Sequence, residues 1–143
     1  MNHFAKIAAQ LESHDLDGML LTNEANRFYA SGFHSAGTDG MALVTPEKFY
    51  YFTDSRYTEA ARGHVQGADI QEVGAGRGYS VLLQEAIQRH HIRRLGFEDA
   101  YMTVREHDLY AKALPCQLVP AADLLAQLRD VKDPEELEIM VAA

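Results

Sequence analysis

Polar residues that could take part in chemistry gather in two short loops of this sequence. The first loop is residues 33–40, Phe-His-Ser-Ala-Gly-Thr-Asp-Gly, in which His34 and Asp39 supply an imidazole and a carboxylate. The second is residues 53–57, Thr-Asp-Ser-Arg-Tyr, in which Arg56 adds a guanidinium that suits carboxylate binding. Spacing alone does not assemble these groups into an active site, and by itself it favours ordinary turn chemistry in both loops.

The remaining residues that could bind metal or act as nucleophiles show no catalytic or metal-binding spacing. No two of the seven histidines lie at i, i+4, and no His-Glu-x-x-His or Gly-x-Ser-x-Gly motif occurs. Cys116 is the only cysteine, which argues against structural zinc, and its apolar neighbours predict a small buried side chain. We therefore expect no catalytic residue and no metal ligand here, and only His34 stays open among the histidines.

Three glycines, Gly74, Gly76 and Gly78, stand between a predicted strand and a predicted helix, as in a phosphate-binding loop. Tyr79 occupies the position where the dinucleotide fingerprint needs its third glycine, and no Gly-Lys-Ser/Thr follows. We interpret the segment as a flexible turn that precedes a helix. A free-standing nucleotide-binding domain stays as an alternative.

Charge and hydropathy limit the partners of the chain. The formal net charge is −8, which disfavours nucleic acid as a partner. The basic run at residues 89–94 falls at a predicted helix end, where cations complement the helix dipole. No segment approaches the roughly 18–20 apolar residues of a membrane span, and residues 1–18 lack the apolar core of a secretory signal. We expect a cytoplasmic protein that does not contact membranes.

Helical and strand patterns alternate along the chain, and a capping-box sequence, Thr-Val-Arg-Glu, opens the helix at Thr103. Two strands separated only by the turn at residues 46–48 predict an antiparallel hairpin. The fold class is therefore α/β, with a mixed β-sheet of about five or six strands that has a leading antiparallel hairpin and is flanked by helices. Strands are predicted at residues 19–22, 41–45, 49–53, 68–73, 94–98 and 117–119. Helices are predicted at residues 4–11, 24–31, 57–64, 79–87, 103–113 and 120–129.

The last residues carry a strong helix start. Asp133 suits an N-cap, Pro134 suits the first helical position, and the two glutamates that follow favour the positive end of a helix. The apolar stripe that begins there ends after two turns, and so short a helix is marginal alone. We expect residues 1–131 to form one domain, and residues 132–143 to be a linker and the start of the first helix of a second domain that is truncated.

Four segments in order resemble the N-terminal domain of the creatinase/prolidase family. Residues 26–33 resemble its N-x-x-Y-x-[ST]-G-F segment, and residues 40–44 with 53–57 resemble its next hairpin and D-x-R-Y turn. Residues 95–98 resemble its [IL]-G-[FV]-E strand, and residues 128–136 its LR-x-[IV]-K-[DS]-x-E-E junction. Each motif is loose alone, but their order over most of the chain makes the match specific.

The resemblance implies a larger enzyme whose catalytic part lies elsewhere. Family members are mainly Xaa-Pro dipeptidases and aminopeptidases, metalloproteases whose C-terminal pita-bread domain binds two divalent metals of the Mn, Co or Zn type. That domain would begin near Pro134, so this chain would be inactive alone. Its implied partners are its own catalytic domain, a second subunit in a homodimer, and proline-containing peptide substrates. Its implied role is to help form the dimer and shape the substrate entrance.

The resemblance also assigns candidate site residues. The loop after Phe33 matches a substrate-facing element of prolidases, so His34 and Asp39 are candidates for contact with the active site of the partner subunit. Arg56 is a candidate for anchoring a substrate carboxylate or for the dimer contact. Asn26, Tyr29 and Asp54 are expected to stabilise a helix or a turn.

Two alternatives within the same architecture stay open. The chain could be the N-terminal domain of a creatinase-type amidinohydrolase, which would act on a guanidino compound. It could also come from a catalytically inactive paralogue that binds peptides. The metal ligands of the following domain would separate an enzyme from a binding module.

Overall fold

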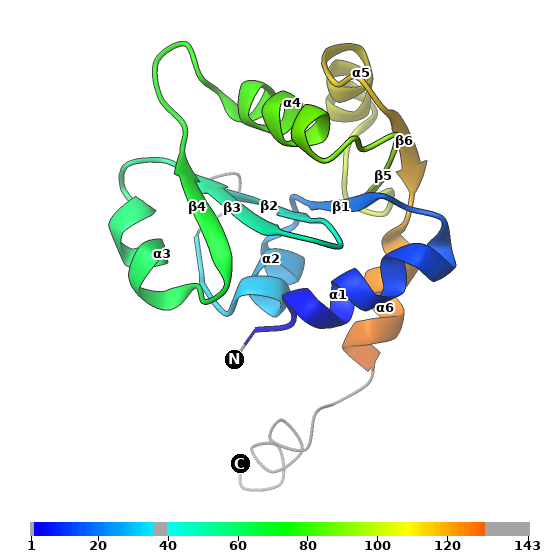
Figure 1. The fold of residues 1–143 in the computed structure, drawn as a ribbon, viewed down its shortest axis with the longest axis horizontal. Coiled ribbons are helices and arrows are strands. Elements are labelled where there is room, and N and C mark those ends of the chain that lie inside the picture. The colour runs from blue at the N-terminus through cyan, green and yellow to red at the C-terminus, as the bar shows by residue number, and fades with distance from the viewer. Residues whose placement is uncertain (1, 36–39, 131–143) are drawn as a thin grey trace, which may run out of the picture.

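The computed structural model describes residues 2–35 and 40–130, which form one β-sheet covered by helices on both faces (Figure 1). The strands are β1 Gly18–Leu21, β2 Gly40–Val44, β3 Phe49–Thr53, β4 Ala68–Glu72, β5 Arg94–Phe97 and β6 Gln117–Pro120. The helices are α1 Phe4–Leu11, α2 Glu24–Ser31, α3 Thr58–His64, α4 Tyr79–Arg89, α5 Val104–Ala113 and α6 Ala122–Asp130, with a short 3-10 turn at Glu12–His14. The six predicted strands and six predicted helices are confirmed within a few residues at their ends.

The six strands lie in the order β4-β3-β2-β1-β5-β6. The hairpin β2–β3 is antiparallel, as predicted. On its other side, β2 also pairs antiparallel with β1. The remaining pairs, β3–β4, β1–β5 and β5–β6, are parallel. The hairpin thus sits inside a mixed sheet, which confirms the predicted fold class.

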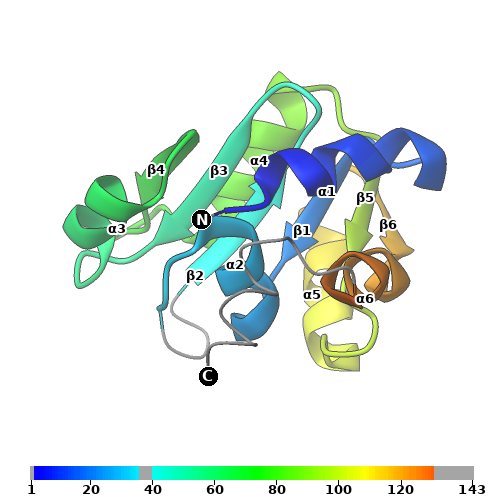
Figure 2. The same cartoon turned by 90° about the horizontal axis from the view of Figure 1, so that it is seen from below.

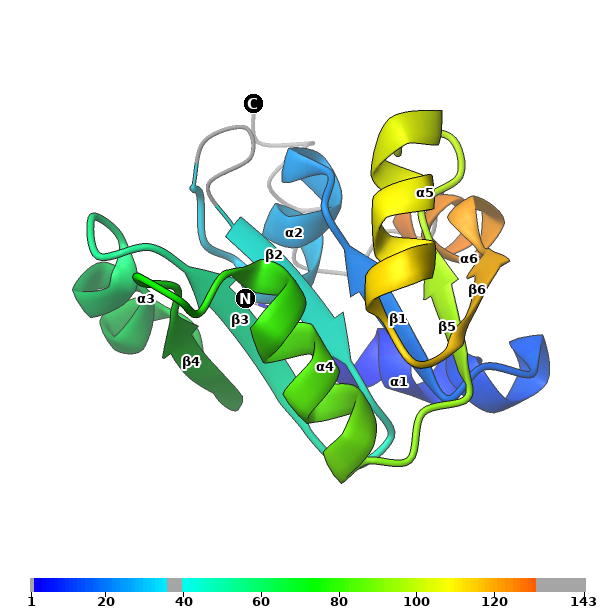
Figure 3. The same ribbon diagram turned by 90° about the horizontal axis from the view of Figure 1, so that it is seen from above.

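Alternation along the strands divides the core in two. Met19 and Leu21 of β1 face one side of the sheet, where α1, α2, α3 and α6 pack, and Leu20 faces the other, where α4 and α5 pack. Figure 2 shows α1, α2 and α6 across the first face, and Figure 3 shows α4 and α5 across the second. Both faces of the central strands β1 and β2 are buried, which explains why these two strands are continuous apolar runs, whereas the edge strands β4 and β6 are partly exposed and carry polar residues.

Gly96 explains why the strand motif at residues 95–98 contains a glycine. A Cβ at this position would lie 2.7 Å from Met19 Sδ, 2.9 Å from Leu16 Cδ1 and 3.0 Å from Ala121 Cβ. Any larger residue would push apart β1, β5 and the start of α6. The glycine therefore allows the last helix to pack closely on the sheet.

The predicted helix ends are also confirmed where the structure describes them. Thr103 and Glu106 form the full capping box that opens α5. The basic run follows the predicted pattern, since α4 ends at Arg89 and His90 is its C-cap. The expected domain boundary and the helix start at Pro134 lie outside the described residues, so both stay predictions.

Candidate functional site

Helix α2 carries the residues that organise the candidate site. The Asn23 side chain caps its first turn by accepting from the Asn26 amide, and Gly32 ends it in the left-handed conformation, at φ 72°. Asn26 and Arg27 are both buried, at 2% and 1% exposure. Because helix neighbours point about 100° apart, the two side chains reach different surroundings.

Asn26 belongs to a network around Glu98, which is fully buried at the end of β5. The Glu98 carboxylate accepts hydrogen bonds from the Thr22 hydroxyl (2.6 Å), the Asn23 amide (2.9 Å) and the Asn26 side chain (2.7 Å). Arg129 of α6 donates to the Asn26 side-chain oxygen at 3.0 Å. A buried carboxylate is tolerated when its lone pairs are satisfied in this way. This Glu98 network therefore joins β1, α2, β5 and α6.

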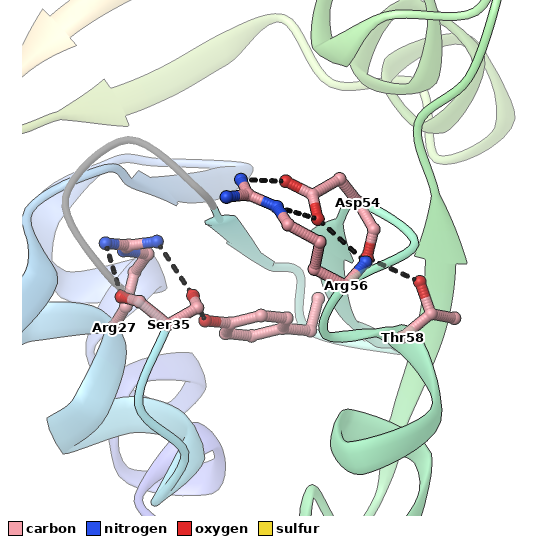
Figure 4. A network of polar contacts seen from close by, with 6 residues as sticks. Arg27, Ser35, Asp54, Arg56 and Thr58 are labelled. Carbon is pink, nitrogen blue, oxygen red and sulfur yellow. Dashed lines mark hydrogen bonds and ion pairs between the residues drawn. The ribbon is translucent and has the colours of Figure 1, made fainter.

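Arg27 belongs to a second network, on the side of the hairpin (Figure 4). Its Nη1 donates to Ser35 Oγ at 3.1 Å and its Nη2 to the Ser35 carbonyl oxygen at 3.2 Å. Ser35 Oγ shares a 2.6 Å hydrogen bond with the Tyr51 hydroxyl. Burial raises the pKa of Tyr51, although Ser35 and Arg27 oppose this. We call Arg27, Ser35 and Tyr51 the Arg27 cluster.

Buried and exposed residues alternate from Ser31, the last residue of α2, to Ser35. Ser31, Phe33 and Ser35 are buried, whereas Gly32 and His34 are exposed. Ser31 Oγ donates to the Arg27 carbonyl (2.6 Å) and accepts from the Phe33 amide (3.1 Å). His34 therefore points outward between two anchored neighbours. Asp39, the other candidate in this loop, lies outside the described residues.

His34 stacks on Phe28 at the surface. The ring centroids are 3.9 Å apart with an interplanar angle of 11°, and Phe28 stays 41% exposed. Tyr29, also on α2, carries a second stack: its ring centroid lies 4.2 Å from that of His3. A hollow of about 750 Å³ is lined by His3, Asn23, Glu24, Ala25, Phe28, Tyr29, Gly32, His34 and Arg129. Its aromatic walls suit contact with an apolar or cyclic group.

Arg56 is placed at the same end of the hairpin as the loop of His34. Gly40 pairs with Thr53, so the first residue of β2 lies beside the last residue of β3, from which the turn with Arg56 continues. The Arg56 guanidinium holds the Asp54 carboxylate through two bonds of 3.1 and 2.7 Å, and this lowers the pKa of Asp54. Asp54 also accepts from the Arg56 amide, which makes the pair a turn stabiliser. Arg56 remains 63% exposed.

The described residues hold no cluster that could bind a metal ion. Among residues 2–35 and 40–130, no three His, Cys, Asp or Glu side chains converge as a metal site would require. Burial raises the pKa of the Cys116 thiol to about 11, which suppresses its thiolate form. Gly74 and Arg77 pair across a tight turn, as expected for a turn that precedes α4. No helix in the described part is long and apolar enough to span a bilayer.

Fold and site together define the class: an α/β domain that presents an aromatic surface segment from a six-stranded mixed sheet. A profile of the creatinase/prolidase N-terminal domain matches residues 4–131, and the chain belongs to this family. It is 36% identical over 132 residues to the uncharacterized peptidase YqhT of Bacillus subtilis (strain 168), a match that covers 90% of the chain and 35% of YqhT. The resemblance inferred from the motifs is thus confirmed.

Solved structures support the same family. The Xaa-Pro dipeptidase from Bacillus anthracis is 28% identical with a TM-score of 0.83, over 95% of this chain and 37% of that one. The N-terminal domain of the cytoplasmic peptidase PepQ from Mycobacterium tuberculosis H37Rv is 27% identical with a TM-score of 0.75, over 89% of this chain and 98% of that one. The chain covers 35% of YqhT and 37% of the Bacillus anthracis dipeptidase, so it corresponds to one domain of these longer proteins.

The contacts of four buried residues were not predicted from the sequence, namely those of Arg27, Ser35, Tyr51 and Glu98. Arg27 and Glu98 fall inside the matched motifs, but no role followed from their position there. The signal that could have identified them is the presence of charged residues inside otherwise buried patterns, because such residues need specific partners.

Proposed function

We propose that this chain is the non-catalytic N-terminal domain of a metal-dependent Xaa-Pro dipeptidase or aminopeptidase, where it helps form the dimer and shapes the substrate entrance. The observation that carries this proposal is the exposed stack of His34 on Phe28, beside an aromatic hollow, where Phe28 lies in the segment that matches the family motif and His34 directly follows it. Exposed aromatic pairs of this kind are typical of contact surfaces.

The proposed enzyme has two parts. Catalysis and the two divalent metals of the Mn, Co or Zn type belong to a C-terminal domain that would follow the boundary near residue 131. The residues described here do not fit such a metal pair, because their acids and histidines do not converge. Residues 1–143 are accordingly expected to be inactive alone.

The proposed entrance consists of the segment at the end of α2 and the turn after β3. His34 and Asp39 would face the active site of the partner subunit in a homodimer and contact a proline-containing peptide. Arg56 would add a charged contact to the dimer or to a substrate carboxylate, since it remains exposed although it is paired with Asp54. Prolyl rings pack well on aromatic surfaces, which suits the hollow beside Phe28.

We also infer a cytoplasmic location. The likeness to the N-terminal domain of the cytoplasmic peptidase PepQ supports this location, and so do the acidic composition and the single cysteine.

The test is a set of alanine substitutions in the full-length protein. His34→Ala and Asp39→Ala should raise KM for Xaa-Pro peptides or change the preferred peptide length, whereas His14→Ala, outside the hollow, should change neither. Unchanged kinetics in both variants would remove these residues from the site. Hydrolysis of creatine instead of Xaa-Pro peptides would replace the proposed substrate class.

A further inference from the structure

His34 owes its outward position to its two neighbours, Phe33 and Ser35, which are 9% and 3% exposed. Phe33 is held by packing, since its ring contacts the Tyr51 ring edge to face, with the ring centroids 5.8 Å apart. Ser35 is held by Arg27, which donates to both its side chain and its main chain. We propose that Arg27 is a positioning residue that acts through Ser35 to place His34 at the surface contact.

Two parallel donors make Arg27 suited to this task. A planar guanidinium that reaches Oγ and the carbonyl oxygen of one residue fixes the direction of the main chain as well as the side chain. Because Arg27 is itself buried, its side chain has little freedom to follow a displaced loop. A lysine would offer a single point charge and could not hold both acceptors in the same way.

The far end of the loop meets the same cluster. A Cβ at Gly40 would lie 2.5 Å from Ser35 Oγ and 2.8 Å from the Tyr51 hydroxyl, and closer still to Arg27 Nη1. Only glycine therefore lets β2 start against the cluster. Ser35 and Gly40, the residues that border segment 36–39, are thus both packed on Arg27.

The effect on catalysis rests on the proposed function, whereas the position of His34 can be measured in this chain alone. Stacking on Phe28 shields the ring protons of His34, so their NMR shifts report whether the stack is kept. Ser35→Ala removes one acceptor of Arg27 and the partner of Tyr51, and Tyr51→Phe removes only the hydroxyl. Both variants keep the apolar core. Arg27→Lys directly tests whether the two guanidinium donors to Ser35 are needed.

We expect the His34 ring signals to lose their upfield displacement in Arg27→Lys and Ser35→Ala, and to move less in Tyr51→Phe. The matched control is Tyr50→Phe, which removes a buried tyrosine hydroxyl on the opposite face, where it contacts His90 at 2.6 Å. It should lower stability but leave His34 unchanged. An unchanged His34 signal in folded Ser35→Ala, or an equal change in Tyr50→Phe, would overturn the proposal.

A kinetic measurement on the full-length protein then separates the two proposals. If both hold, Ser35→Ala raises KM for Xaa-Pro peptides several-fold with little change in kcat, and Tyr50→Phe does not. If the NMR signals move but KM does not, Arg27 positions His34 and the entrance role of His34 is wrong. A loss of stability alone would not produce this split between KM and kcat.

Discussion

Asn26 and Arg27 are neighbours on α2, yet they organise buried polar groups in different parts of the molecule. Asn26 joins residues distant in sequence, since its partners Glu98 and Arg129 lie 72 and 103 residues away. Arg27 binds Ser35, only 8 residues away. The Glu98 network ties together elements that make the core, whereas the Arg27 cluster holds one surface segment. Substitutions in the Glu98 network should therefore lower the stability of the domain. Substitutions in the Arg27 cluster should instead displace the loop that carries His34.

The largest effect is expected from Glu98→Ala. The substitution leaves the part-buried donors of Thr22 and Asn23 and the buried donor of Asn26 without their acceptor, at a cost of about 3 kcal/mol or more in the free energy of unfolding. Urea denaturation measures it, with the exposed Glu59→Ala as control. Glu98→Gln keeps the shape and should lose less. A loss below about 1 kcal/mol in Glu98→Ala would contradict the role of the network.

Gly40→Ala should give the next largest effect and should act on the loop as well. The added methyl meets Ser35, Tyr51 and Arg27 at under 3.0 Å, so we expect a loss of about 1–3 kcal/mol together with altered His34 NMR signals. Gly63→Ala is the matched control, because nothing lies within 4 Å of its Cβ in α3. That control should raise stability by up to about 1 kcal/mol.

A pH effect is expected away from both clusters, at His90. Burial lowers the pKa of His90, an effect that Glu47 opposes and Arg89 reinforces, so the folded state disfavours its proton. The unfolded state then binds more protons between the lowered pKa and 6.5, and the free energy of unfolding falls as pH drops through that window. His90→Gln should flatten this dependence in denaturation curves, while the His34 NMR signals of the variant stay unchanged at neutral pH.

His34→Ala should have the smallest effect on stability. Because its side chain is exposed, the free energy of unfolding, measured by thermal denaturation, should change by less than about 0.5 kcal/mol. A larger loss would mean that the stack on Phe28 belongs to the framework, and it would weaken the contrast between the two regions. Phe28→Ala, on the same surface, provides the comparison for the stack itself.

Much of the framework could be predicted from local patterns, because apolar alternation and capping residues act over a few positions. The hairpin β2–β3 and the capping box at Thr103 are examples. The partners of Glu98 and Arg27 could not be predicted, since they depend on which strands become neighbours in the sheet. His34 and Arg56 stay predicted candidates that rest on the family resemblance. The stack of His34 on Phe28 and the ion pair of Arg56 with Asp54 could not be predicted, because they depend on the geometry of α2 and of the turn after β3.

The position of α6 has a consequence for synthesis of the chain. Helix α1, the first helix of this domain to be translated, packs against α6, and Leu124 and Leu125 complete the apolar cluster that contains Phe4 and Ile7. The hydrogen bond from Arg129 to Asn26 likewise cannot form until α6 has been translated. Because α1 also contacts β1, β2 and α2, only the part of its apolar surface that faces α6 stays uncovered until nearly the whole domain has been translated. Exposed apolar surface of this kind favours aggregation of incomplete chains.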